Sequence, residues 1–335
     1  MRIFRPAYYD RFHCIAGACP DSCCKEWTVV VDPEAAAKYR ALPGPLGDRL
    51  RAAMDTDEAG DTELVLEDGR CPMWRSDGLC QIQVQIGEEA LCQVCRRFPR
   101  LTHDYGDFVE LGLELSCPEA ARLIFASPAA PFLWEDVPGG TEPAYDRQAM
   151  TILRQTRQTL LAFLEDRTYS IGQVLTVLLL YCYDVDDALS FSEDAPEEFL
   201  PEDYLRLAEQ LPRQGALADI FEFYRSLEIL TPRWRRILEN GPVDSPWSED
   251  FRPLIRYFLE RYCLQAVSDY DLAARAKFMA LSCLMIRAAG GSTMDAAQLY
   301  SKEIENDADN VNAILDAAFA DPALNDSAIV TLLLA

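Results

Sequence analysis

The sequence predicts an α+β protein, mostly α, in which a small cysteine-rich, metal-binding N-terminal domain is followed by an all-helical C-terminal domain. Three observations lead to this prediction. Nine of the 12 cysteines fall between Cys14 and Cys117. Beyond a stretch rich in proline and glycine, apolar residues recur at helical spacing. The 335 residues, 50% of them hydrophobic, are enough for two domains with sizeable cores.

The N-terminal domain is predicted to alternate short strands with short helices. Trp27–Val31 has strand character, and Asp32 followed by Pro33 marks the start of a helix. Glu88–Arg97 is predicted as one short helix that presents Cys92 and Cys95 on the same face. Further elements are expected at 48–54 (helix), 63–66 and 109–115 (strands), and 119–125, where Cys117-Pro118 opens a helix.

The predicted domain boundary is the segment Ser127–Pro143, which is rich in proline, glycine and alanine. We therefore expect a cysteine-cluster domain over residues 1–126, a linker over 127–144 and a helical domain over 145–335. Helices of the last domain are predicted at 145–166, 171–189, 202–210, 216–230, 232–239, 249–267, 271–289, 293–306 and 311–320.

The chain is strongly acidic, with a formal net charge of -24. Residues 1–125 contain 14 basic and 21 acidic side chains, so they contribute -7 and the remainder contributes -17. Such a surface repels phosphates and argues against a nucleic-acid partner. It suits a basic, lysine-presenting protein partner, although high charge also serves solubility alone.

Neither a signal peptide nor a membrane span is expected. The N-terminus does not combine a basic start, an apolar core and a cleavage site. The longest apolar run, Val174–Tyr183, is too short to cross a bilayer and is predicted to be a buried helix. We therefore expect a cytoplasmic protein with no membrane partner, whose cysteines serve as thiolate ligands rather than disulfides.

The cysteine spacing predicts a metal centre. Short spacings, including the CxxC of Cys92 and Cys95, let one loop direct two thiolates at one ion, and distant pairs complete the shell. Zinc and an iron–sulfur cluster each need four cysteines. The nine clustered cysteines could therefore form two sites, or one site with spare thiols. Because the side chains of adjacent Cys23 and Cys24 diverge, one of them is expected to face a second site or the core.

Other cysteines and the histidines have competing interpretations. Any single clustered cysteine can instead be a buried free thiol, and the isolated residues Cys182, Cys263 and Cys283 are predicted to be core residues. His13 and His103 lie near the cysteine stretch in sequence. Each is a candidate ligand or proton shuttle, although a lone histidine is more often neither.

The cysteine-bearing segments resemble the flagellin lysine-N-methylase (FliB) family and, more broadly, zinc- or iron-chelating cysteine-cluster domains. The resemblance covers residues 1–125 and is carried by the runs FRPAYYDRFHCIAGACPDSCCKEWTVVVD, GRCPMWRSDGLCQIQVQIGEEALCQVCRRFPR and LELSCPEAARLIF. It implies methylation of flagellin lysines with S-adenosylmethionine as donor, and an iron–sulfur cluster, with 4Fe–4S favoured and zinc as the alternative. The family's cysteine pattern falls on Cys19, Cys23, Cys24, Cys71, Cys80, Cys92, Cys95 and Cys117, and Cys14 lies in a matching stretch.

The chemistry itself is not readable from motifs. The chain has no GxSxG elbow, P-loop, HExxH or GxGxxG, and no glycine-rich S-adenosylmethionine loop. A radical-type CxxxCxxC begins at Cys19 and Cys23, but Glu26 stands at its third position. The catalytic and donor-binding residues are therefore unassigned.

Four residues near the cysteines are candidates for orienting a substrate ammonium, and each has a simpler interpretation as a surface or packing residue: Tyr8, Tyr9, Asp10 and Asp21. Two other functions compete with methyl transfer. The chain is alternatively a non-enzymatic zinc- or iron-binding module for interaction or assembly, or, less favoured, a redox sensor built on the clustered thiols.

Overall fold

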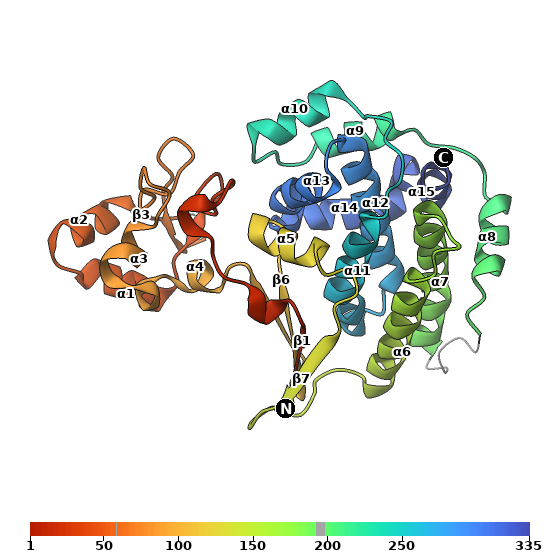
Figure 1. The fold of residues 1–335 in the computed structure, drawn as a ribbon, viewed down its shortest axis with the longest axis horizontal. Coiled ribbons are helices and arrows are strands. Elements are labelled where there is room, and N and C mark those ends of the chain that lie inside the picture. Colours follow the sequence, from red (N-terminus) through yellow and green to blue (C-terminus); the bar gives the residue numbers. More distant parts are fainter. Residues whose placement is uncertain (58, 192–197) are drawn as a thin grey trace.

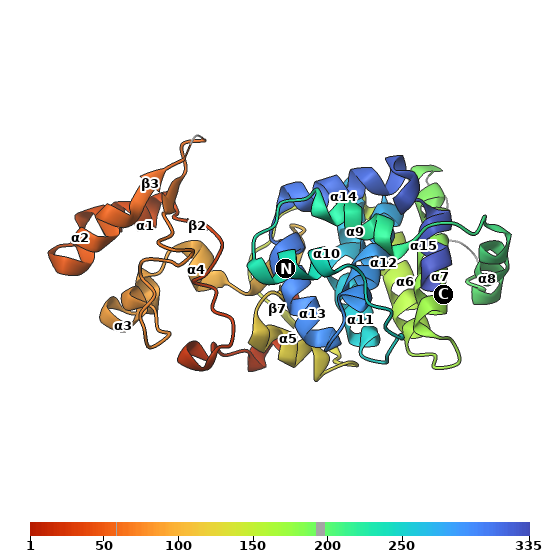
Figure 2. The same cartoon turned by 90° about the horizontal axis from the view of Figure 1, so that it is seen from above.

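The computed structural model describes residues 1–57, 59–191 and 198–335 and consists of a large helical body with a small mixed lobe beside it (Figure 1). Most of the chain is helical, and two small sheets account for the named strands. This confirms the prediction of an α+β, mostly α protein. Figure 2 shows the small lobe at one side of the body rather than wrapped around it.

The body contains a four-stranded sheet with the order β5-β6-β1-β7. Its strands are β1 (Arg2–Pro6), β5 (Arg100–Asp104), β6 (Phe108–Leu113) and β7 (Phe132–Asp136). β1 pairs parallel with β6 and antiparallel with β7. No strand was predicted for the residues of β1, β5 or β7, and β7 lies inside the stretch predicted as a linker. The sheet thus fixes the N-terminus against segments roughly a hundred residues away.

Helices pack against this sheet and against each other to form the rest of the body. They are α5 (Pro118–Phe125), α6 (Arg147–Leu164), α7 (Ile171–Phe191), α8 (Pro201–Gln210), α9 (Leu217–Arg225), α10 (Pro232–Asn240), α11 (Phe251–Tyr262), α12 (Leu272–Ala289), α13 (Thr293–Tyr300), α14 (Ala308–Ala320) and α15 (Asp326–Leu333). All except α15 were predicted from the sequence, α5 from its Cys117-Pro118 start and the others from the helical character of the C-terminal segment.

The centre of the body is the pair α7 and α12, which pack against each other. Both are apolar on nearly every face, which is the pattern of a helix surrounded by others. Their cysteines, Cys182 and Cys283, are buried, and so is Cys263, as predicted. No helix in the described ranges has the length and the apolar character needed to cross a bilayer.

The small lobe has its own sheet, with the order β2-β4-β3, and four short helices. Its elements are β2 (Val29–Val30), α1 (Pro33–Ala41), α2 (Gly44–Ala53), β3 (Met54–Thr56), β4 (Thr62–Leu64), α3 (Gln81–Ile86) and α4 (Gln93–Arg97). The Asp32 carboxylate accepts a hydrogen bond from the Ala35 amide at 3.0 Å, so it caps α1 as the Asp-Pro pair predicted.

Buried side chains fall into two clusters, and these divide the chain differently from the predicted linker. The body cluster includes Tyr8, Phe12 and Phe108 together with the C-terminal helices. The small-lobe cluster runs from Val29 to Cys92. The small lobe is therefore inserted between two segments of the body. The domain limits of 1–126 and 145–335, with a linker over 127–144, stay a prediction.

The prediction of one helix over Glu88–Arg97 is wrong. A 3-10 turn covers Glu88–Ala90, the backbone then extends, and α4 begins at Gln93 with Cys92 as its N-cap residue (ψ 160°). The Asp32 carboxylate accepts a hydrogen bond from the Gln93 amide at 2.7 Å. This long-range cap sets the start of α4 and keeps Cys92 outside the helix.

Candidate functional site

A cavity of about 380 Å³ lies where the small lobe meets the body. Seven of the nine clustered cysteines line it, namely Cys14, Cys19, Cys23, Cys24, Cys80, Cys95 and Cys117. Cys117 reaches it from the body, directly before α5, whereas Cys80 and Cys95 come from the small lobe. The site is therefore assembled from both parts of the molecule.

The remaining two clustered cysteines lie behind this wall, in the core of the small lobe. Cys71 and Cys92 are both buried there, and Cys24 and Cys80 pack against the same core. The Cys71 amide donates a hydrogen bond to the Cys24 carbonyl at 2.8 Å. The structure thus brings the eight cysteines of the predicted ligand set into one region, six on the cavity wall and two directly behind it.

Two pairs of thiols interact directly. The hydrogen bond between Cys23 and Cys24 is the main cause that lowers the pKa of Cys24 to about 7, and the same bond raises the pKa of Cys23. The bond between Cys92 and Cys95 likewise lowers the pKa of Cys92 and raises that of Cys95. Burial raises the pKa of Cys117 to about 11. A metal ion bound by either pair would displace the protons of its thiols.

The donor set suits a soft metal or an iron–sulfur cluster, since both are held by thiolates. Within the described ranges, no three His, Cys, Asp or Glu side chains are grouped as a finished metal site. Of the two histidines, only His13 lines the cavity. His103 lines a separate cavity of about 30 Å³ in the body, and its Nε2 atom is buried without a hydrogen-bond partner among the described residues.

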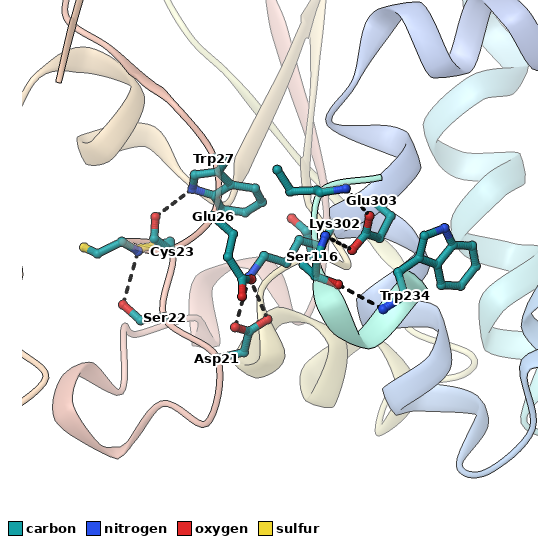
Figure 3. A network of polar contacts seen from close by, with 12 residues as sticks. Asp21, Ser22, Cys23, Glu26, Trp27, Ser116, Trp234, Lys302 and Glu303 are labelled. Carbon is teal, nitrogen blue, oxygen red and sulfur yellow. Dashed lines mark hydrogen bonds and ion pairs between the residues drawn. The ribbon is translucent and has the colours of Figure 1, made fainter. Parts of the chain in front are cut away.

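A buried lysine, Lys302, lies on the body side of the cavity. Figure 3 shows its side chain within a network of polar contacts. The Lys302 side chain is 2% exposed. Its Nζ atom donates to Oδ1 of Asp21 at 3.0 Å, to Oδ2 of the same residue at 3.1 Å, and to Oε2 of Glu26 at 2.8 Å. Lys302 belongs to a π-helical turn, Ser301–Glu305, that follows α13. One cation is thus shared by two carboxylates of the cysteine-bearing loop.

Neighbouring groups hold this ion cluster in place. The Gln298 amide on α13 donates to Oδ2 of Asp21 at 3.0 Å and to the Ser116 carbonyl at 2.8 Å. Trp27 places its ring 5.3 Å from Nζ of Lys302 and donates its indole N–H to the Cys23 carbonyl at 2.7 Å. These contacts fix the loop that carries the first cysteines against the helical body.

The four candidates for orienting an ammonium have different positions. Tyr8 is buried in the body core, and burial raises its pKa far above the usual value. Tyr9 packs partly buried against that core. Asp10 forms an exposed ion pair with Arg5 at 2.8 Å. Only Asp21 lines the cavity.

Sequence reasoning missed Lys302 and Gln298. They lie in a segment predicted only as a helix, about 280 positions from the cysteine loop, and no local motif marks them. The sequence marks this place only by three charged side chains close together near the end of a predicted helix: Lys302, Glu303 and Glu305. All three are buried, and buried charges need specific partners.

Comparison with curated proteins finds relatives with a similar segment. The chain is 32% identical over 141 residues to a lysine-N-methylase of Salmonella typhimurium, a match that covers 40% of this chain and 35% of that protein. The lysine-N-methylase of Salmonella choleraesuis matches to the same extent. The flagellar biosynthetic protein FliU of Salmonella muenchen is also 32% identical over 141 residues, which is 83% of its length.

The match spans about a third of the length of the two lysine-N-methylases. No protein-family profile matches the chain. No solved structure matches it either.

Proposed function

Because the chain belongs to the flagellin lysine-N-methylase (FliB) family, we propose that it transfers methyl groups from S-adenosylmethionine to lysine side chains of flagellin. The observation that supports this most directly is the cavity between the lobes, where seven thiols and the Asp21 carboxylate face one space. Its volume of about 380 Å³ falls in the range of small-molecule sites. It therefore offers room for a donor beside a place for a cationic side chain.

The proposed resident group is an iron–sulfur cluster of the 4Fe–4S type, with zinc as the alternative. The cysteines that would hold it are drawn from Cys19, Cys23, Cys24, Cys71, Cys80, Cys92, Cys95 and Cys117. A bound cluster supplies one-electron chemistry. The protein's own contribution is to gather soft thiol donors in a partly enclosed space, which limits the access of water to them.

For the methyl donor, the cavity provides charge of both signs. Arg96 and Arg100 line it, and guanidinium groups bind carboxylates such as that of the methionine moiety. Asp21 lies on the same wall as Lys302 and suits positive charge. The methyl acceptor must be a neutral amine, and its nitrogen must approach the donor methyl group from the side opposite the leaving sulfur. The cavity walls therefore have to hold the donor and the acceptor in this alignment.

The test is anaerobic purification followed by metal and sulfide analysis and incubation with flagellin and methyl-labelled S-adenosylmethionine. We expect a brown protein that labels flagellin on lysine. A Cys117→Ala variant should lose labelling, whereas Cys283→Ala, which removes a buried thiol of α12, should retain it. Absence of labelling by a protein with an intact cluster would contradict the proposed function.

A second function is a non-enzymatic metal module that serves interaction or assembly. The observation that favours it is the burial of Cys71 and Cys92 in the core of the small lobe, as expected of a closed structural zinc site. A colourless protein that contains zinc and transfers no methyl groups would support this alternative. We propose a cytoplasmic location in either case, because thiols that serve as metal ligands suit a reducing compartment.

A further inference from the structure

The ion cluster at the cavity wall carries an excess negative charge. Asp21 and Glu26 contribute two negative charges, and Lys302 contributes one positive charge, so the group retains a net charge of -1. The Lys302 side chain is 2% exposed, whereas those of Asp21 and Glu26 are 27% and 30% exposed. The remaining charge is therefore accessible on the carboxylate side, and Asp21 presents it to the cavity.

A buried hydroxyl beside this carboxylate has unused hydrogen-bonding capacity. Ser116 is 3% exposed and lines the same cavity, and its Oγ atom makes no hydrogen bond to any described residue. Burial raises the pKa of Glu114, and the nearby Ser116 hydroxyl opposes this rise. The two groups nevertheless lie outside hydrogen-bond geometry. A buried hydroxyl without a partner costs free energy, so a ligand that supplies a donor would relieve it.

Aromatic side chains form the wall next to Asp21. Trp27 and Phe98 both line the cavity and meet edge to face, with ring centroids 5.4 Å apart. Trp27 already holds one ammonium, that of Lys302, at 5.3 Å from its ring. Aromatic surfaces of this kind pack well against the methylene chain of a lysine, and ring faces attract its charged end.

We propose that Asp21, with the Ser116 hydroxyl and the Trp27–Phe98 wall, receives the ammonium group of the substrate's lysine side chain. This assignment rests on the proposed function. Lys302 and Gln298 then act as positioning residues, because their three hydrogen bonds to the Asp21 carboxylate fix its orientation toward the cavity. A carboxylate oxygen can accept more than one hydrogen bond, so Asp21 keeps capacity for a further donor.

The assignment is tested by binding in the absence of S-adenosylmethionine. The probes are a synthetic flagellin peptide with a single lysine and the same peptide with norleucine at that position, both fluorescently labelled for anisotropy with the full chain. We expect the lysine peptide to bind at least about tenfold more tightly, as for a charge-assisted hydrogen bond. Asp21→Asn, which keeps the shape and an acceptor for Lys302, should abolish that preference.

Matched variants control for folding and for charge. Asp61→Asn makes the same charge change at an exposed position of the small lobe outside the cavity and should leave the preference intact. Asp21→Glu restores the carboxylate and should recover part of the preference. Equal affinity of the wild-type chain for both peptides, or an unchanged preference in Asp21→Asn, would overturn the assignment.

The binding assay separates this assignment from the proposed function. A chain that prefers the lysine peptide through Asp21 but transfers no methyl group retains the ammonium site and contradicts the transferase. A chain that methylates flagellin without any contribution of Asp21 to binding supports the transferase and contradicts the assignment of Asp21. The ammonium site must then lie elsewhere.

Discussion

The Nζ atom of Lys302 lies 3.0 Å from Oδ1 of Asp21, although the two residues are 281 positions apart in the chain. Lys302 extends from the helical body, and Asp21 belongs to the loop that carries the first cysteines. The contact therefore holds the cysteine-bearing loop against the helical body. Its loss should affect both stability and the order of the cavity.

Replacing Lys302 with methionine should destabilise the protein by about 1–3 kcal/mol, because it leaves Asp21 and Glu26 close together without their shared cation. The two carboxylates are partly exposed, so water can solvate them and limit the cost. Urea denaturation measures the change. Lys38→Met, which breaks the exposed ion pair with Glu34, is the matched control and should cost less than about 0.5 kcal/mol. Equal effects of the two variants would argue against a central role of Lys302.

Metal content should depend on the clustered cysteines and not on the isolated ones. Cys95→Ala removes a thiol on the cavity wall and should lower the bound iron or zinc per chain. Cys182→Ala removes a thiol buried in α7 and should leave the metal content unchanged. Elemental analysis of proteins purified without oxygen gives both values. Partial loss would indicate two sites, and equal metal content in both variants would rule out Cys95 as a ligand.

Binding of flagellin should weaken as salt is added, if the acidic helices guide the partner. The residues after 125 contribute -17 of the total charge of -24. Raising the salt concentration from about 0.1 M to about 1 M shortens the screening length from about 10 Å to about 3 Å. Surface plasmon resonance across this range should show mainly a slower association rate. A flat dependence would mean that the acidic surface serves solubility instead.

Stability should fall as the pH drops below about 6.5, in part because of His103. Burial is the main cause that lowers its pKa, the Arg261 charge adds to it, and the Glu110 charge opposes it. The unfolded chain therefore binds a proton at a higher pH than the folded chain does. The contribution of His103 is present in full above the unfolded pKa and is lost as the pH falls toward the folded one.

His103→Leu isolates this contribution. The difference in urea midpoint between pH 7.5 and pH 5.5, which are about one unit above and below the ordinary histidine pKa, should be smaller in the variant than in the wild-type chain. Other groups titrate in the same range, among them Glu260, whose pKa burial raises to about 7. The comparison with the variant removes their shared effect. Identical pH dependence in the two proteins would show that His103 does not contribute.

Features that depend on neighbouring residues follow from the amino-acid sequence alone. Helical periodicity identified α7 and α12 because their side chains are buried on almost every face. The Asp32-Pro33 pair located the start of α1, since capping needs only a few adjacent residues. The spacing of the cysteines and the family resemblance likewise predicted that the thiols lie close together, and seven of them line the cavity.

Which distant segments meet depends on tertiary packing and not on any local pattern. β1 pairs with β6 across about a hundred residues, and the Gln93 amide finds its cap in Asp32 instead of continuing the predicted helix. Lys302 reaches Asp21 in the same way. Such contacts leave no periodic pattern in the sequence, because the helix, strand or loop that carries each partner could form equally well without the other. The sequence therefore indicated a cysteine centre. The fold shows that, of the four candidates for orienting an ammonium, Asp21 lines its cavity.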